Sequence, residues 1–202
     1  IKNSDESAEV YRYDDSNKNL YNKLTAASRV QKFSKNYIRN HSVELNTSHW
    51  EKASWRGVSI DQIKGNITTE EAYMGTKSLK ITKDTNSSRD FYQQWLSGLV
   101  RKKSYVLSAY VKTKDITKTS NGGAALFISY KDTSGKYNTF ESTYIQGTNQ
   151  WSRYYIRFSL PDNADTANVS ACLGIIEESG TAYFDCIQLE EGNVPSRYSL
   201  VE

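Results

Sequence analysis

A single aspartate, Asp185, lies in the middle of residues 181–190, which otherwise have the pattern of a buried strand. The neighbouring residues of the same parity are apolar, namely Tyr183, Ile187 and Leu189, so strict alternation places the carboxylate on the apolar side. Burial of a lone carboxylate is costly unless an ion pair, hydrogen bonds or a metal ion compensates it. The sequence therefore predicts a partner for Asp185 and leaves the kind of partner open.

Residues that could perform acid–base or nucleophilic chemistry are few. The two histidines, His41 and His49, belong to no metal-binding motif such as H-E-x-x-H, and the sequence holds neither a G-x-S-x-G motif nor a phosphate-binding glycine loop. Two carboxylates at a suitable separation could hydrolyse a glycosidic bond. The candidates are Glu70, Glu71, Glu141, Glu177 and Glu178. Because adjacent acidic residues are usually solvated loop charges, we expect no enzyme, with a polysaccharide lyase or hydrolase as the alternative.

The composition favours a soluble, aromatic-rich protein. Fifteen Tyr and four Trp accompany two Pro and one Met in 202 residues, and such rings suit both sandwich cores and binding surfaces. The net charge of +3 is small, and basic residues are interleaved with acidic ones, which argues against a nucleic-acid-binding surface. Neither a membrane-spanning apolar run nor a signal peptide is recognisable. We expect no nucleic-acid partner and no membrane insertion.

The two cysteines, Cys172 and Cys186, lie in consecutive predicted strands. They are too few for a disulfide framework or a structural zinc site. One bridge and two free buried thiols both remain open.

From about residue 40 onward, the chain alternates short strand-like runs with clusters of Gly, Asn, Asp and Ser that are typical of antiparallel connections. The predicted strands are residues 41–45, 77–82, 90–96, 104–113, 124–131, 139–145, 152–160, 167–176 and 181–190. This pattern predicts an all-β jelly-roll sandwich of two antiparallel sheets over residues 39–202. Residues 1–38 are predicted to form an irregular extension, with a turn or two of helix in residues 22–38 that presents Leu24, Val30 and Phe33.

The parity of the strands also predicts a polar, aromatic face opposite the core. Its residues are Gln93, Trp95, Tyr110, Arg153, Tyr155 and Arg157. Pyranose rings stack on flat aromatic side chains, while amide and guanidinium groups bind sugar hydroxyls, so this face suits carbohydrate. The alternative is that these aromatic residues are ordinary strand formers. Trp50 and Trp55 could either border a binding site or fill the edge of the core.

Five segments, in order, resemble jelly-roll carbohydrate-binding modules of families four, nine and twenty-two, which have a galactose-binding-domain-like fold. The segments are "NHSVELNTSHWEKASW", "GTKSLKIT", "YQQWLSGLVRKKSYVLSAYVKT", "QWSRYYIRFSLP" and "GTAYFDCIQLEEG", and the resemblance covers about residues 40–192. It implies a non-catalytic module whose partner is a polysaccharide or cell-surface glycan. The alternative is a spacer or adhesin domain that has lost sugar binding.

The same resemblance implies a structural calcium ion between the first and last strands. The corresponding ligands here are Glu44, Asp185 and a backbone carbonyl at Lys77 or a neighbour. Calcium prefers several oxygen ligands, so it would compensate the burial of Asp185. The alternative partner is a set of backbone N–H groups, or a nearby Lys or Arg.

The flanks are similar to a second family. The segment "YRYDDSNKNL" (residues 11–20) resembles a degenerate copy of the tyrosine–aspartate repeat of bacterial YD-repeat or Rhs-type wall-associated proteins. This resemblance implies that the chain is a module of a larger parent protein that is secreted or displayed on the cell wall or cell surface.

Overall fold

The computed structural model describes residues 9–14, 19–25, 35–46, 49–55 and 57–198, and its contacts divide the chain into two units, Ile1–Ser34 and Lys35–Glu202. In the first unit, β1 (Glu9–Asp14) pairs with β2 (Asn19–Thr25) as an antiparallel hairpin. The expected helix is therefore wrong at Leu24, which belongs to β2, because strand pairing overrides a weak helical pattern. Val30 and Phe33 lie outside the described residues.

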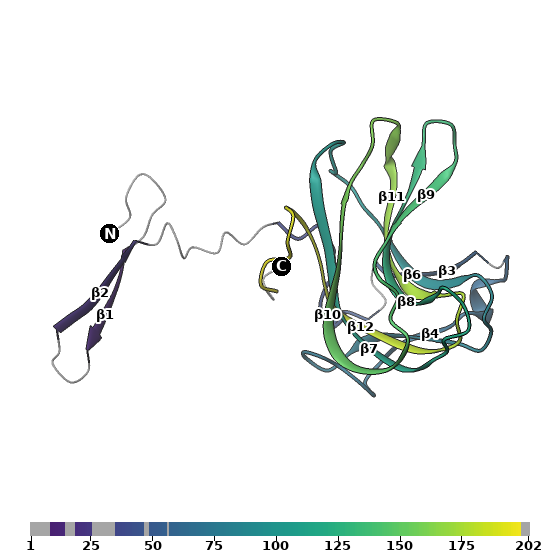
Figure 1. Cartoon of the computed structure of the whole chain (residues 1–202), viewed down its shortest axis with the longest axis horizontal. Coiled ribbons are helices and arrows are strands. Elements are labelled where there is room, and N and C mark those ends of the chain that lie inside the picture. The colour runs from purple at the N-terminus through teal and green to yellow at the C-terminus, as the bar shows by residue number, and fades with distance from the viewer. Residues whose placement is uncertain (1–8, 15–18, 26–34, 47–48, 56, 199–202) are drawn as a thin grey trace. The chain divides into compact units, whose positions relative to one another are not determined.

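The second unit is a sandwich of two five-stranded sheets in which all strand pairs are antiparallel (Figure 1). The β12 sheet has the order β10 (Gly147–Ser159), β7 (Ser104–Ile116), β12 (Gly180–Glu191), β5 (Ser78–Lys83) and β4 (Lys64–Thr68). The β11 sheet has the order β3 (Glu51–Ser54), β6 (Arg89–Trp95), β11 (Ala164–Ile176), β8 (Gly123–Asp132) and β9 (Tyr137–Glu141). The short 3-10 helix η2 (Ile60–Gln62) precedes β4. The predicted all-β sandwich is confirmed.

The predicted strands and the described ones differ mainly near the start of the sandwich. Residues 41–45 form turns, and Val43 has a left-handed φ of 62°, which a strand does not permit. The strands β3 and β4 were not predicted, because their short sequences, EKAS and KGNIT, contain few apolar residues. They pair with β6 and β5 respectively, so neighbouring strands stabilise them.

The core lies between the two sheets and follows the predicted alternation. On β7, Leu107 and Val111 are buried, as are Ile156 and Phe158 on β10, and they pack with apolar residues from the inner face of the β11 sheet. Burial of each such side chain stabilises the fold by roughly 1.5–3 kcal/mol. The main core therefore packs the two sheets against each other, and their outer faces do not take part in it.

The two cysteines lie in different sheets, Cys172 on β11 and Cys186 on β12. Both are free and buried, so the alternative of two free thiols is confirmed. Burial raises the pKa of the Cys172 thiol to about 12.

The part of the chain that the structure describes contains no helix whose length and apolar character would let it span a membrane.

Residues 36–38 contact β12 directly. The Asn36 side chain accepts a hydrogen bond from the Leu189 N–H at 2.9 Å and donates one to the Ile187 carbonyl at 3.2 Å, while the Tyr37 N–H donates to the Leu189 carbonyl at 2.8 Å. Ile38 is 3% exposed and belongs to the core. The contacts thus begin before residue 39, where the sequence places the start of the module.

A chain that begins at residue 39 is therefore expected to be less stable than one that begins at residue 35. Loss of the buried Ile38 side chain removes roughly 1.5–3 kcal/mol, and each lost hydrogen bond removes about 1 kcal/mol. For a domain of this size, the sum lowers the thermal midpoint by roughly 10–20 °C. Calorimetry of residues 35–202 and 39–202 measures the difference; equal midpoints would contradict the assignment of residues 36–38 to the module.

Candidate functional site

The predicted binding residues are divided between the two sheets. They are Gln93 and Trp95 of β6 in the β11 sheet, and Tyr110 of β7 with Arg153, Tyr155 and Arg157 of β10 in the β12 sheet. All of them point away from the core, and the outer faces of two packed sheets lie on opposite sides of a sandwich. The expectation of one shared face is wrong, because parity defines a side of a strand's own sheet but not which sheet the strand joins.

The outer face of the β12 sheet is partly covered by other segments. Tyr73, from the loop of residues 69–77, stacks on Tyr110 with a centroid distance of 3.6 Å. The Arg153 guanidinium donates to the Ser196 carbonyl at 2.6 Å and to the Ser108 hydroxyl at 2.8 Å, so the C-terminal segment holds it in place. Of the predicted residues on this sheet, only Tyr155 and Arg157 are exposed, whereas Tyr110 and Arg153 are half-buried.

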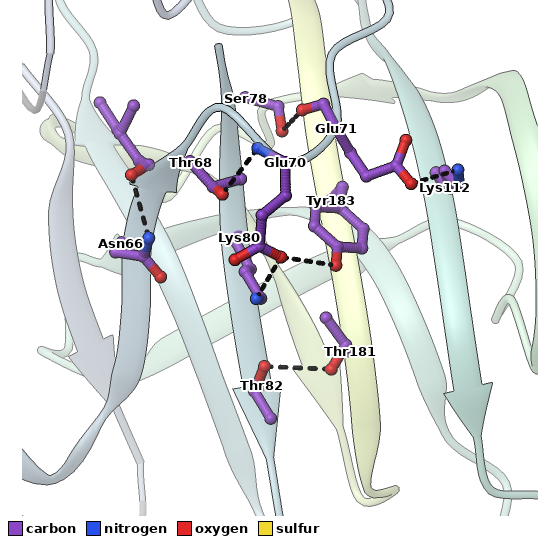
Figure 2. A network of polar contacts seen from close by, with 11 residues as sticks. Asn66, Thr68, Glu70, Glu71, Ser78, Lys80, Thr82, Lys112, Thr181 and Tyr183 are labelled. Carbon is purple, nitrogen blue, oxygen red and sulfur yellow. Dashed lines mark hydrogen bonds and ion pairs between the residues drawn. The ribbon is translucent and has the colours of Figure 1, made fainter.

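The same face carries a network of ion pairs (Figure 2). Lys80 pairs with Glu70 at 2.7 Å, and Lys112 pairs with Glu71 at 2.6 Å. An open groove of about 480 Å³ runs beside this network and is lined largely by charged and hydroxyl side chains. Glu70 and Glu71 are thus each paired with a lysine.

The outer face of the β11 sheet has an apolar centre. Phe91 of β6 and Phe127 of β8 are almost fully buried, with ring centroids 5.1 Å apart, and they form a second hydrophobic cluster with Cys172. Trp55 follows β3 and meets both rings edge to face, at 6.0 and 6.2 Å. Its side chain is nevertheless 45% exposed. Trp55 therefore presents a fixed aromatic surface to solvent, whereas Trp50 is buried in the core.

A charged pair lies beside Trp55. The Arg89 guanidinium is 4.5 Å from the centroid of the Trp55 ring and forms an ion pair with Glu141 of β9. Both side chains of the pair are less than 20% exposed. Glu141 also accepts hydrogen bonds from the Tyr144 hydroxyl at 2.5 Å and the Thr139 hydroxyl at 2.8 Å. The network thus joins the two opposite edges of the sheet across its outer face.

The electrostatics keep the Glu141 carboxylate ionised at neutral pH. Burial raises the pKa of Glu141, but hydrogen bonds from Tyr144, Arg89 and Thr139 outweigh that effect and hold the pKa below its ordinary value. Burial and the bond to Glu141 raise the pKa of Tyr144 to about 12, so its hydroxyl keeps its proton. The cluster therefore offers one anion, one cation and one hydroxyl in a semi-buried position.

Next to the apolar centre, this face carries a row of cross-strand neighbours that starts at Trp95 and continues over three small hydroxyl residues. Trp95 lies opposite Ser170 of β11, which lies opposite Ser129 of β8, which in turn lies opposite Thr139 of β9. Trp95 is 47% exposed. It lies four positions from Phe91 along β6, a separation of roughly 13 Å at about 3.3 Å per residue. Two exposed indole rings therefore border a polar area on the same face, with Gln93 between them.

Parity reasoning placed Gln93 and Trp95 correctly on an outer face but missed Arg89, Glu141 and Tyr144. Arg89 has the same parity as Gln93 and Trp95, so extending the predicted strand by one residue would have found it. The sequence offers Glu141 as a catalytic candidate, and its ion pair with Arg89 is not predictable because the partner is far away in sequence. The predicted strand of residues 139–145 would place Tyr144 on the side opposite to Glu141, but β9 ends at Glu141, so no strand period applies to Tyr144.

The residues predicted for calcium do not fit that ion in this structure. Asp185 accepts hydrogen bonds from the N–H groups of Tyr73, Met74 and Cys186, and Glu44 accepts them from those of Thr76 and Lys77. Calcium needs roughly six to eight oxygen ligands, and N–H donors repel a cation. Burial raises the pKa of Asp185 above its ordinary value, and the N–H groups oppose this shift. Within the described residues, no group of three or more His, Cys, Asp or Glu could hold a metal ion.

Several of the solved structures that the sandwich resembles are carbohydrate-binding modules. One is a xylan-binding domain from family 22, with 18% identity and a TM-score of 0.60 over 79% of this chain and 98% of that one. Another is the C-terminal family 22 carbohydrate-binding module of Clostridium thermocellum Xyn10B, with 20% identity and a TM-score of 0.59 over 79% of this chain and 98% of that one. At these identities the likeness shows the fold alone.

One curated relative is the tRNA(Glu)-specific nuclease WapA of Bacillus subtilis subsp. natto, which is 28% identical over 195 residues. The match covers 90% of this chain but spans only 8% of the length of that protein. In the family comparison, residues 35–180, more than half of the chain, match the family described as "Carbohydrate binding domain". The chain therefore belongs to the carbohydrate-binding domain family of types 4 and 9.

Proposed function

We propose that this chain is a non-catalytic module that binds a glycan on the outer face of the β11 sheet. The observation that carries the proposal is the exposed Trp55 ring, which is fixed over an aromatic floor and lies beside the half-buried ion pair of Arg89 and Glu141. An exposed ring together with fixed polar groups is the general form of a site for a small polar ligand. Membership of the carbohydrate-binding domain family supports the same conclusion.

In the proposed mechanism, one sugar ring stacks on Trp55 while its hydroxyls bind the charged pair. The Arg89 guanidinium carries five N–H donors, so it can pair with Glu141 and still donate to a ligand. Gln93 supplies an amide between Trp55 and Trp95, and Trp95 offers a second ring for a neighbouring sugar unit. Because the side chains are already held by the sheet and by one another, little conformational entropy is lost on binding.

The predicted residues of the β12 sheet are left out of this proposal. Tyr110 lies under Tyr73, and Arg153 is held by Ser196, so neither is open to a ligand. Tyr155 and Arg157 are exposed, but they belong to the other sheet and so lie away from Trp55 and the ion pair of Arg89 with Glu141.

We further propose that the chain is part of a larger protein that is secreted or held at the cell wall or cell surface. The support is the 8% share of the curated relative's length that the chain spans, together with the repeat-like segment at residues 11–20. The nuclease activity in that relative's name is not proposed for this chain. In such a setting, several weak contacts of the parent protein would add to the affinity of the module.

Affinity gel electrophoresis tests the binding proposal directly. The chain is run through native gels that contain xylan, a β-1,4-galactan, a β-glucan or a bacterial cell-wall polysaccharide, with serum albumin as the non-binding control. We expect at least one polysaccharide to retard the chain. Migration that equals the control in every gel would overturn the proposal and favour the alternative of a spacer or adhesin domain.

A further inference from the structure

The loop of residues 69–77 connects β4 to β5 and crosses the outer face of the β12 sheet. Its first half is tied down by the ion pairs of Glu70 with Lys80 and of Glu71 with Lys112, which Figure 2 shows. The Ser78 hydroxyl also donates to the Glu71 carbonyl at 2.6 Å. These contacts fix the path of the loop from β5 across to β7.

The second half of the loop is held by two carboxylates that come from distant parts of the chain. Asp185 of β12 accepts the N–H groups of Tyr73 and Met74 at 2.9 and 3.0 Å. Glu44 accepts the N–H groups of Thr76 and Lys77, both at 2.9 Å. Four of the five N–H groups of residues 73–77 therefore point at two carboxylates, with Gly75 between the two pairs.

Gly75 permits this arrangement. Its φ is +74°, a conformation that residues with a side chain rarely adopt, and an added Cβ would lie 2.5 Å from Glu44 Oε1. The loop thus turns sharply at Gly75 so that donors on either side reach separate carboxylates. A side chain at position 75 would displace the Glu44 carboxylate, so the position of Glu44 requires a glycine here.

The lone pairs of both carboxylates are largely used by these donors. A carboxylate offers about four acceptor sites. Asp185 uses three of them, on Tyr73, Met74 and its own neighbour Cys186, and Glu44 uses three, on the Thr76 and Lys77 N–H groups and the Thr76 hydroxyl. A calcium ion at either carboxylate would have to displace these hydrogen bonds.

The positive charge near Glu44 is supplied by the protein itself. The Lys77 ammonium donates to the Glu44 carbonyl at 2.9 Å and to the Asn46 side-chain oxygen at 3.1 Å. Carbonyl and amide oxygens of this kind are typical calcium ligands, and here a lysine occupies them. The backbone N–H groups and Lys77 together balance the two anions.

We infer that Asp185 and Glu44 form a metal-free clasp that holds loop 69–77 against the β12 sheet. The clasp places Tyr73 on Tyr110 and so closes this face of the module. Asp185 is a positioning residue in this role, because it acts on Tyr73 and Met74 through their backbones. The hydrogen bonds compensate the burial of its carboxylate, a task for which the family resemblance implies calcium and for which backbone N–H groups are the alternative.

Thermal unfolding in millimolar calcium and in excess chelator tests the inference. A cation that binds only the native state must raise the midpoint by mass action. We expect equal midpoints in the two buffers for the unaltered chain. A midpoint that rises with calcium and no longer does so in Glu44→Gln would overturn the inference, because Glu44 would then be a metal ligand.

Variants test the clasp itself. Asp185→Asn, Glu44→Gln and Gly75→Ala are each expected to lower the midpoint, whereas Asp84→Asn, which removes a carboxylate from an exposed ion pair with Lys64, serves as the control and should barely change it. Because both carboxylates hold one loop, Asp185→Asn with Glu44→Gln together should lower the midpoint by less than the sum of the two. Additive losses would contradict a shared clasp. If Asp185→Asn does not fold, Glu44→Gln alone still tests the clasp, and an unchanged midpoint for it would contradict the inference.

Neither test depends on sugar binding, so the inference and the proposed function can fail separately. A chain without calcium dependence that binds no polysaccharide would retain the clasp and lose the proposed function. A chain that binds polysaccharide and needs calcium at Glu44 would support the proposed function and overturn the metal-free clasp.

Discussion

Gly174→Ala is expected to destabilise the module by about 3–5 kcal/mol, in the range of the most damaging core substitutions. Gly174 lies on β11 opposite Phe91 of β6. A Cβ at this position would lie 2.2 Å from the Asp90 carbonyl oxygen and 2.4 Å from Phe91 Cβ. Backbone atoms cannot yield as a flexible side chain can, so the two central strands must separate and break their ladder of hydrogen bonds.

Chemical denaturation measures this effect, with Gly57→Ala as the matched control. Gly57 has a φ of +69°, and no atom lies within 4 Å of its added Cβ. The control should therefore lose only the roughly 1–2 kcal/mol of a left-handed residue with a side chain. A loss for Gly174→Ala no larger than that of the control would contradict the close approach of β6 and β11. Because Phe91 belongs to the floor of the proposed site, a folded Gly174→Ala chain should also bind glycan less tightly.

Trp55→Ala is expected to lower glycan affinity by about 10- to 100-fold, since each factor of ten corresponds to about 1.4 kcal/mol. Truncation removes the exposed ring on which a sugar would stack. It also removes the cation–π contact that orients the Arg89 guanidinium at 4.5 Å, which weakens the polar part of the site. The fold should survive, because Trp55 lies outside the main core.

The matched control for Trp55→Ala is Tyr155→Ala, which removes an exposed aromatic ring from the β12 sheet instead. The two rings are similarly exposed, at 45% and 53%. Isothermal titration with an oligosaccharide from the retarding polysaccharide should give an unchanged affinity for Tyr155→Ala. A loss for Tyr155→Ala together with unchanged affinity for Trp55→Ala would transfer the site to the opposite face.

The fold was largely predictable because its signals are local. The alternation on β7 and β10 predicted correctly that Leu107 and Ile156 face inward, and the turn residues between strands predicted antiparallel pairing. The strands β3 and β4 carry little apolar pattern, and their existence depends on pairing with β6 and β5. Such a strand cannot be recognised from its own residues, because it forms only through pairing with its neighbour.

The site was predictable only in part because it depends on how strands are assigned to sheets. Trp95 and Tyr155 were both placed correctly on an outward side, yet their strands belong to different sheets. Alternation placed Asp185 on the core side with Ile187 and Leu189, which is wrong, because the register of β12 shifts after Asp185 and the residue lies opposite Tyr110 on the outer side of the sheet. Asp185 is buried there by a loop more than 100 residues away, whose backbone N–H groups donate to its carboxylate. Side-chain parity contains no information about either relation, since both are set by long-range topology.

The indole N–H signals of the four tryptophans provide the most direct test of the proposed binding face. Trp55 and Trp95 are exposed on the β11 sheet, Trp151 lies beside Tyr73 on the β12 sheet, and Trp50 is a buried internal reference. Single Trp→Phe variants assign the signals, and an oligosaccharide from the retarding polysaccharide is then titrated while nitrogen–proton correlation spectra are recorded. We expect the Trp55 and Trp95 signals to shift with a common saturation curve while those of Trp151 and Trp50 stay in place. A shift of Trp151 with Trp55 unchanged would contradict glycan binding on the β11 sheet.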